Sequence, residues 1–344
     1  MHINWKPIAE ILQGKHNFVL TTHMSPDGDG LGSEIALYHL LTDMGKSVRI
    51  FNPSLTPGEY AFLDPDEVVE KYDPALHKPV VDNADVFIVL DIGDYSRLQD
   101  LGTDIQTSAG ITVCIDHHPQ NKHEFDYEAV DIDTAATGMM VFELIKSMAP
   151  DAINFEIAQG LYCALMTDTG SFRFSNTTPF AHQMAKELLE YGVDPPTVYS
   201  NVYESSSIER MRLLGLIIER LQFAADGKIV YFPVTLKMQE KAGTTHQDVD
   251  GFSDFIRSLG DIEVAVMFHE LNPERTRINF RSKGRVIINT VAKKFGGGGH
   301  MYAAGAIIEK PYPKVIPEVI SATEQVLHQL NTDKKSRKMK QTVS

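Results

Sequence analysis

The sequence predicts an α/β protein with two parts: a doubly wound, mainly parallel sheet with a helical connector, and a smaller α+β domain. The first half of the chain alternates short apolar runs with segments of helical period, which is typical of parallel strands covered on both faces. After a long helical stretch, the second half returns to strand-like runs. The length of 344 residues also exceeds the usual size of a single hydrophobic core.

The strands of the first domain are predicted from continuous apolar runs bounded by polar residues. The helix between the first two strands is predicted over residues 31–44, where apolar side chains recur with the 3.6-residue period and Gly45 ends the pattern. The predicted strands are residues 18–22, 47–51, 86–90 and 111–115, and the later helices are residues 139–148, 155–166 and 179–191.

The main domain boundary is predicted at the turn signal Asp226–Gly227, which gives domains of residues 1–225 and 226–344. The basic run of residues 334–340 is interpreted as a solvated, disordered end. The second domain is predicted to contain strands at 229–234, 264–270, 275–281 and 305–309 and a helix at 286–295.

Composition and charge exclude several classes of protein. No run approaches 18 apolar residues and no secretory signal pattern opens the chain, so we expect neither a membrane span nor export. Cys114 and Cys163 lie in apolar runs, which argues against a disulfide framework and for the cytoplasm. The net charge of −14 argues against a protein that coats duplex nucleic acid, although bound metal ions can reverse the local field.

Acidic and histidine residues follow several predicted elements directly. Because the carboxyl ends of parallel strands meet at one edge of a sheet, we expect these side chains to converge there. Carboxylate and imidazole ligands together suit divalent ions such as Mn²⁺, and two such ions would cancel the repulsion between crowded carboxylates. The six candidate ligands are His23, Asp27, Asp29, Asp91, His117 and Asp168.

Each of these signals has a simpler interpretation when it stands alone. Asp27-Gly-Asp-Gly30 is more often a turn or a helix N-cap, and Asp91 alone could cap a helix. The histidine pair could be a surface turn, and Asp168 could belong to a helix-terminal loop. That all of them fall at the ends of predicted elements favours a shared metal site.

The second domain carries a different set of candidates. The run Gly296–Gly299 allows backbone N–H groups to approach a ligand closely, and we expect the adjacent His300 to contact that ligand. Arg281 suits bidentate phosphate binding, but from the pattern alone a cross-strand salt bridge is equally good. Arg173 is a weaker candidate of the same kind.

The set of motifs resembles the DHH phosphoesterase superfamily, in its oligoribonuclease and 3′-phosphoadenosine 5′-phosphate (pAp) phosphatase type. The C-terminal motifs resemble the DHH-associated domain of that superfamily. The resemblance rests on Thr22–Ser33, Asp91, Asp116–His118 and Thr167–Phe174, and then on Arg281–Ser282, Phe295–His300 and Ala303–Gly305. It spans nearly the whole chain, and none of the six ligand positions departs from the pattern.

The resemblance implies a role for each matched residue. His23, Asp27 and Asp168 would hold one metal, Asp29 and His117 the other, and Asp91 would bridge them. His118 would face the scissile phosphate, with Asp116 orienting its neighbouring histidine. Arg281 and Ser282, with Gly297, Gly298, Gly299 and His300, would bind the substrate, and the implied cofactor is a pair of Mn²⁺ ions.

The expected function is therefore two-metal hydrolysis of short RNA to mononucleotides and dephosphorylation of pAp. The expected partners are short single-stranded RNA or small nucleotides, with neither long duplexes nor membranes, and a homodimer is left open. Alternatives are a pApA or cyclic di-AMP phosphodiesterase, an exopolyphosphatase or pyrophosphatase, and a non-catalytic nucleotide sensor. The intact ligand set argues against the sensor, and the glycine run with His300 argues for a nucleotide-sized ligand.

Overall fold

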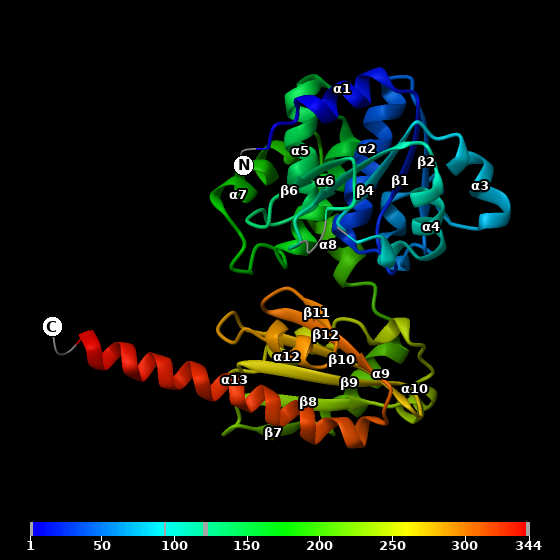
Figure 1. The fold of residues 1–344 in the computed structure, drawn as a ribbon. Helices are drawn as coiled ribbons and strands as arrows, with labels where there is room; N and C mark the ends of the chain where they lie inside the picture. Colours follow the sequence, from blue (N-terminus) through cyan, green and yellow to red (C-terminus); the bar gives the residue numbers. More distant parts are fainter. Residues whose placement is uncertain (1–2, 93, 120–122, 342–344) are drawn as a thin grey trace. The chain divides into compact units, whose positions relative to one another are not determined.

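The chain divides into two compact units, Met1–Ser205 and Ser206–Ser344, whose elements are labelled in Figure 1. Each unit has its own sheet and its own hydrophobic cores, so each is described separately. The computed structural model describes residues 3–92, 94–119 and 123–341.

The N-terminal unit is built on a parallel sheet of six strands among the described residues, in the order β3-β2-β1-β4-β5-β6. The strand order reverses between β1 and β4, so the sheet is doubly wound and the predicted fold class is confirmed. The strands are β1 (Asn17–Thr21), β2 (Ser47–Asn52), β3 (Val69–Lys71), β4 (Val86–Leu90), β5 (Ile111–Asp116) and β6 (Tyr127–Val130).

Helices cover both faces of this sheet (Figure 1). One core lies beneath α1, α2, α5, α6 and α7, and the other beneath α3 and α4. The 3₁₀ turns are η1 (Gly58–Leu63), η2 (Tyr95–Leu98) and η3 (Pro150–Ala152). The helices are α1 (Lys6–Gly14), α2 (Gly28–Asp43), α3 (Pro74–Asp82), α4 (Gln99–Thr107), α5 (Thr137–Met148), α6 (Phe155–Asp168), α7 (Pro179–Leu189) and α8 (Pro195–Tyr203).

Helices α2 and α6 approach each other closely through a pair of glycines. A Cβ atom on Gly32 would lie 2.2 Å from the carbonyl oxygen of Gly160, and one on Gly160 would lie 2.6 Å from the carbonyl oxygen of Gly32. Only glycine permits this contact between backbones. It brings the two helices together, with Asp29 in the first turn of α2 and Asp168 at the end of α6.

The C-terminal unit has a mixed sheet in the order β11-β12-β10-β9-β8-β7, in which β8 and β9 are parallel and the other pairs are antiparallel. Helices α12 and α13 cover one face, and α9, α10 and α11 cover the other. The strands are β7 (Gln222–Ala224), β8 (Ile229–Val234), β9 (Val264–Asn272), β10 (Arg275–Ser282), β11 (Gly298–Gly299) and β12 (Ala303–Ile308). The helices are α9 (Ile208–Ile218), α10 (Leu236–Ala242), η4 (Gln247–Val249), α11 (Phe252–Arg257), α12 (Asn289–Lys294) and α13 (Tyr312–Gln341).

The division between the units lies earlier in the chain than the turn at Asp226–Gly227 suggests. Leu213 and Ile217 of α9 share a core with Val230 of β8, and β7 pairs with β8. The Asp226–Gly227 turn therefore joins two strands of one sheet and does not separate the two units.

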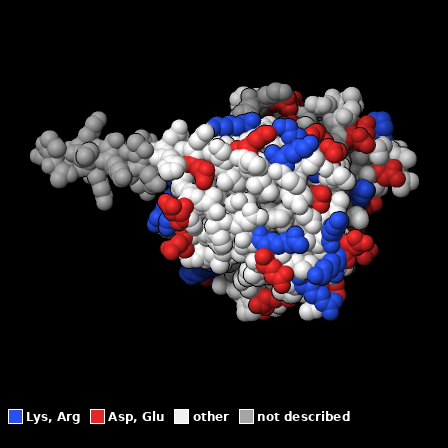
Figure 2. Space-filling model, turned by 90° about the horizontal axis from the view of Figure 1, so that it is seen from below, with Lys and Arg blue, Asp and Glu red and all other residues white. Residues whose placement is uncertain are grey.

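The basic run near the C-terminus lies inside helix α13, which continues to Gln341, where the sequence suggested a disordered end. No helix among the described residues combines the length and apolar composition needed to cross a bilayer. On the face drawn in Figure 2, basic and acidic side chains are interspersed around a broad uncharged area. Among the residues coloured in this view, the basic side chains do not form a continuous strip of the kind that follows a nucleic-acid backbone.

Candidate metal centre

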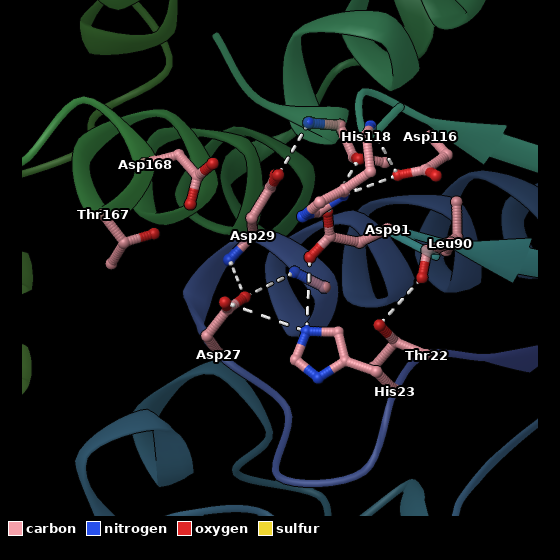
Figure 3. A network of polar contacts seen from close by, with 12 residues as sticks. Thr22, His23, Asp27, Asp29, Leu90, Asp91, Asp116, His118, Thr167 and Asp168 are labelled. Carbon is pink, nitrogen blue, oxygen red and sulfur yellow. Dashed lines mark hydrogen bonds and ion pairs between the residues drawn. The ribbon is translucent and has the colours of Figure 1, made fainter. Parts of the chain in front are cut away.

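Three neighbouring strands deliver ionisable side chains to the point where the strand order reverses. His23 follows β1, Asp91 follows β4, and Asp116 and His117 lie at the end of β5. Figure 3 shows side chains from these strands turned toward one another, with Asp168 approaching from α6. Ligands of open α/β sheets bind at this position, outside the carboxyl ends of the strands.

The loop after β1 is shaped by Asp27, which is the N-cap of α2. Its Oδ1 accepts hydrogen bonds from the backbone N–H groups of Asp29 at 3.1 Å and Gly30 at 3.2 Å. Its Oδ2 is turned toward Nε2 of His23, 3.8 Å away. The N-cap that the sequence offered as a simpler interpretation is therefore present, and the same carboxylate also faces the site.

His23, Asp27 and Asp91 form the first group of candidate ligands. Nε2 of His23 lies 3.3 Å from Oδ2 of Asp91. The other ring nitrogen, Nδ1, donates to the carbonyl oxygen of Met24 at 3.1 Å. This bond fixes the ring so that Nε2 points at the carboxylates, as metal-binding imidazoles require.

Asp29, His117 and Asp168 form the second group. Nε2 of His117 lies 3.2 Å from Oδ2 of Asp168, 3.6 Å from Oδ2 of Asp29 and 3.4 Å from Oδ1 of Asp91. Nδ1 of His117 donates to the carbonyl oxygen of Thr134 at 3.2 Å. Asp91 thus presents Oδ2 to the first group and Oδ1 to the second, which is the arrangement of a bridging ligand.

The position of Asp168 differs from the division of ligands that the resemblance implied. Asp168 was expected beside His23 and Asp27, but the structure groups it with Asp29 and His117. Asp168 ends α6, which packs on α2, and Asp29 lies in the first turn of α2. The two carboxylates are therefore brought to the same side of Asp91.

Asp91 has a left-handed backbone conformation, with φ of 62°. This region is unfavourable for residues other than glycine, and such strain persists only where the surroundings hold it. Asp91 N–H donates to the carbonyl oxygen of Ile115 at 3.0 Å, and the hydroxyl of Thr137 donates to its Oδ1 at 3.1 Å. The strain directs the side chain between the two ligand groups.

The pKa values of the two histidines reflect competition between burial and the neighbouring carboxylates. Burial opposes protonation of His23, but the contacts with Asp91 and Asp27 outweigh it and raise the pKa of His23 to about 9. Burial likewise opposes protonation of His117, and the pKa of His117 is raised by Asp168 and Asp91. Without other cations, protons on these two rings offset only part of the negative charge of the carboxylates.

The pKa values of two buried carboxyl groups indicate that positive charge in the site would be favourable. Burial raises the pKa of Asp29 well above its usual value, and repulsion from Asp91 and Asp168 adds to it. Burial also raises the pKa of Asp168. Oxygen and imidazole ligands gathered around this uncompensated charge fit divalent cations better than any neutral ligand. The residues present therefore fit a metal centre.

Comparisons with known proteins support the same interpretation. The model of the DHH family N-terminal domain matches residues 17–165, and that of the DHHA1 domain matches residues 226–329. A Thermus thermophilus protein named bifunctional oligoribonuclease and PAP phosphatase NrnA is 32% identical over 91% of this chain and 92% of its own length. The chain belongs to the DHH family.

Two further similar proteins match the chain over both the DHH and the DHHA1 domains. A Bacillus subtilis protein with the same name is 30% identical over 84% of this chain and 88% of its own length. The crystal structure of an exopolyphosphatase-related protein from Bacteroides fragilis is 26% identical and covers 95% of this chain and 97% of its own, with a TM-score of 0.89. The similarity therefore includes both domains.

The third residue of the Asp116-His117-His118 motif is oriented by the first. Oδ1 of Asp116 accepts from Nδ1 of His118 at 2.8 Å and from the backbone N–H of His118 at 3.0 Å. Asp116 is fully buried, whereas a quarter of the His118 side chain is exposed, at 26%. Burial opposes protonation of His118, but the bond to Asp116 raises its pKa.

Sequence reasoning missed a network that holds the ends of the strands in the DHH domain together. The Asn52 side chain accepts from Thr22 N–H at 2.9 Å and donates to Oε2 of Glu34 at 2.9 Å. The hydroxyl of Thr22 donates to the carbonyl oxygen of Leu90 at 2.8 Å, as Figure 3 shows. Thr22 and Leu90 precede His23 and Asp91, so the network sets the spacing of these two ligands.

Thr137 at the start of α5 was also missed. Its backbone N–H donates to Oδ2 of Asp29 at 2.7 Å, and that of Gly138 donates to Oδ1 at 2.8 Å. Asp29 therefore also caps α5, where the helix dipole favours a negative charge. A Thr-Gly pair before an apolar helical run was the available signal.

Arg173 and the two polar candidates of strand β10 have structural partners of their own. Nε of Arg173 donates to the carbonyl oxygen of Gly170 at 2.7 Å. Nε of Arg281 donates to Oδ2 of Asp254 on α11 at 2.8 Å. Arg281 therefore has a salt bridge, but its partner lies on a helix and not on a neighbouring strand, as the cross-strand alternative had it. Ser282 is 1% exposed, and its hydroxyl accepts from Val286 N–H at 3.2 Å.

The glycine run of the DHHA1 domain forms the short strand β11 beside β12. A Cβ atom on Gly297 would lie 2.0 Å from the carbonyl oxygen of Gly305, whereas one on Gly298 would meet nothing within 4 Å. The close approach that the glycines permit is thus partly an approach to the neighbouring strand. His300 follows this strand and is exposed.

Proposed function

We propose that the protein is a phosphoesterase that hydrolyses short RNA oligonucleotides to mononucleotides and removes the 3′-phosphate of pAp. The observation that carries this proposal is the position of Asp91, whose two oxygens face two separate groups of ligands. Relatives of 30–32% identity that match most of this chain are named as bifunctional oligoribonuclease and PAP phosphatase.

The two groups would hold a pair of divalent cations, for which we propose Mn²⁺. His23 and Asp27 would hold one cation, Asp29, His117 and Asp168 the other, and Asp91 both. Bound at these residues, the cations would supply positive charge for the phosphoryl oxygens and a more acidic water as nucleophile. The mixture of imidazole and carboxylate ligands is of the kind that Mn²⁺ accepts.

His118 would move a proton during the reaction. Asp116 binds Nδ1 of the ring, and Nε2 would be the atom that exchanges a proton with the substrate. In both proposed reactions water adds to phosphorus, the bond from phosphorus to the 3′-oxygen breaks, and that oxygen takes up a proton. A single centre can therefore serve RNA and pAp.

The DHHA1 domain would bind the phosphate end of the substrate, through the backbone of Gly297, Gly298 and Gly299, through His300 and through Arg281. The buried hydroxyl of Ser282 would support the turn to Val286, and Arg173 would stabilise the loop after Asp168. We keep the expected cytoplasmic location as part of this proposal, together with short single-stranded RNA and small nucleotides as partners.

A substrate panel tests the proposal. Purified protein is assayed with pApA, a five-residue RNA, pAp, cyclic di-AMP, pyrophosphate and polyphosphate, each with Mn²⁺, Mg²⁺ or a chelator. We expect turnover of pApA, the RNA and pAp with Mn²⁺ and none with chelator. Preference for polyphosphate or pyrophosphate would replace the proposed substrates, and no turnover of any compound would favour a nucleotide sensor.

A further inference from the structure

A second feature of the DHH domain lies at the same edge of the sheet as the metal centre. It is a groove with a volume of about 1160 Å³, which is large enough for a nucleoside or a larger ligand. Its walls come from the chain between β2 and β3, from β3 itself, from the start of α3, and from residues 98–101 after β4.

The groove wall is joined directly to the loop that carries two of the candidate metal ligands. Ser25 N–H donates to the hydroxyl of Ser54 at 2.8 Å. Nε2 of Gln99, which lines the groove, donates to the sulfur of Met24 at 2.8 Å. Met24 and Ser25 lie between His23 and Asp27, so one short loop connects the groove wall to two of the candidate metal ligands.

Apolar side chains are unusually exposed in this groove. Leu55 is 71% exposed and Leu76 is 69% exposed, and prolines at positions 53, 65 and 74 add further apolar surface. The lining therefore mixes apolar surface with polar and charged groups, and exposed apolar side chains in a pocket can contact the apolar part of an organic ligand. A ribose and a base would cover these side chains.

The charge of the groove restricts what can enter it. Asp64, Glu67, Glu70, Asp73 and Asp100 line it, against Lys71 and His77. Glu70 is paired with Arg49 outside the lining, but the remaining carboxylates still outnumber the cations. Such a surface disfavours a phosphate group, so the groove suits the uncharged part of a nucleotide.

We propose that this groove binds the nucleoside attached to the scissile phosphate on the side opposite to the bond that breaks. RNA has this nucleoside, and pAp lacks it. The inference rests on the proposed function and names one of its subsites. Chemically, pApA is pAp with a second adenosine esterified to its 3′-phosphate. In both molecules the same bond breaks, so only the second adenosine would contact Leu55 and Leu76.

The test compares these two substrates in the same enzyme. The double variant Leu55→Ala with Leu76→Ala is expected to lower the ratio of kcat/KM for pApA to that for pAp about tenfold, because apolar contact with one nucleoside is lost. Both side chains are largely exposed, so we expect the variant to fold. The matched control is Leu189→Ala at the end of α7, an exposed leucine outside the groove, which should leave the ratio unchanged. An unchanged ratio in the double variant would overturn the proposal.

Calorimetry of metal-free protein gives a second readout that does not depend on turnover. We expect wild type to bind pApA more tightly than pAp, and the double variant to bind the two with equal affinity. Equal affinities in wild type would refute the groove as a subsite. If wild type binds pApA more tightly but hydrolyses neither compound with Mn²⁺, the proposed function fails and the subsite stands.

Discussion

The metal centre of the DHH domain and the glycine strand of the DHHA1 domain both coincide with sequence motifs, but their residues are used differently. At the metal centre, buried carboxylates face one another without enough cations, as the raised pKa values of Asp29 and Asp168 show. In the DHHA1 domain, Arg281 is paired with Asp254, and Gly297 packs against β12. A motif therefore indicates ligand binding most strongly where its residues leave charge uncompensated.

Removal of Asp91 is expected to have the largest effect. Asp91→Asn keeps the shape of the side chain but removes its charge and replaces one of the two oxygens that face the two ligand groups, so turnover of pAp should fall more than about 100-fold. The measurement is kcat with saturating Mn²⁺, combined with calorimetric titration of Mn²⁺.

The matched control is Asp94→Asn, three residues along the chain. Asp94 caps η2 by accepting from Ser96 N–H at 2.8 Å, a role that asparagine also fills. This variant should keep its Mn²⁺ affinity. Wild-type activity in Asp91→Asn would contradict a shared ligand.

Metal binding should stabilise one domain and leave the other unchanged. At a Mn²⁺ concentration about 100 times the dissociation constant, the free energy of unfolding of the DHH domain should rise by about 2.7 kcal/mol. The single tryptophan, Trp5, lies in the core of this domain, so its fluorescence follows the relevant unfolding step. Hydrogen exchange with bound Mn²⁺ should be slower at the ends of β1, β4 and β5 but unchanged in β9 and β10. An equal gain of protection in both domains would argue against a local site.

The glycine run can be tested by comparing two neighbouring positions that differ in the space available for a Cβ atom. Gly297→Ala should destabilise the DHHA1 domain by about 1–3 kcal/mol, because the new Cβ would overlap the backbone of Gly305. Gly298→Ala has open space around its Cβ position and should cost less than about 1 kcal/mol. Hydrogen exchange of β10 and β12 measures both effects, and equal losses would mean that the close approach of β11 to β12 is not a constraint.

The two domains should also respond to pH in opposite directions. Burial raises the pKa of Glu34 in the DHH domain to about 8, from 4.5. The folded state therefore keeps a proton that the unfolded state releases, and the free energy of unfolding should fall as pH rises from about 4.5 to 8. Burial, with His246 and Arg277, lowers the pKa of His269 in the DHHA1 domain to about 4, from 6.5. There the unfolded state binds the extra proton, so stability should be lost as pH falls from about 6.5 to 4.

Each slope has an upper limit of about 1.4 kcal/mol per pH unit from one group. Glu34→Gln keeps an acceptor for Asn52 and should flatten the decline that Trp5 fluorescence reports. His269→Gln should flatten the opposite slope, measured by hydrogen exchange in β9. A variant that leaves its slope unchanged would show that the group does not titrate in that window.

The sequence predicted those parts of the fold that local pattern determines. Strand β4 was placed at residues 86–90, as observed, because its apolar run is continuous and buried on both faces. The edge strands β3 and β6 were missed, since they are short and largely half-exposed. The start of α2 was placed too late because the Gly-Asp-Gly opening hides the cap that Asp27 provides.

In the candidate site, too, local sequence pattern revealed some features, and features that depend on long-range contacts were missed. Its candidate ligands could be named because strand ends are visible in sequence, and the structure brings these side chains together at the edge of the parallel sheet. The support from Thr137 to Asp29 spans 108 positions, and no local pattern reveals such a contact. The grouping of Asp168 likewise depends on how closely α2 and α6 pack, which the sequence alone did not show.

The smallest expected effect separates the two roles of Arg281. Its pair with Asp254 is partly exposed, with side chains 27% and 35% exposed, so the pair should contribute less than about 1 kcal/mol to stability. If the guanidinium also binds the substrate's phosphate, Arg281→Ala should raise KM for pApA while kcat changes little, as loss of uniform binding requires. Asp254→Asn keeps the arginine but weakens its positioning, so it should raise KM less. Equal KM values in Arg281→Ala and wild type would leave Arg281 with only its structural role, because a salt bridge alone predicts a small change in stability and none in substrate affinity.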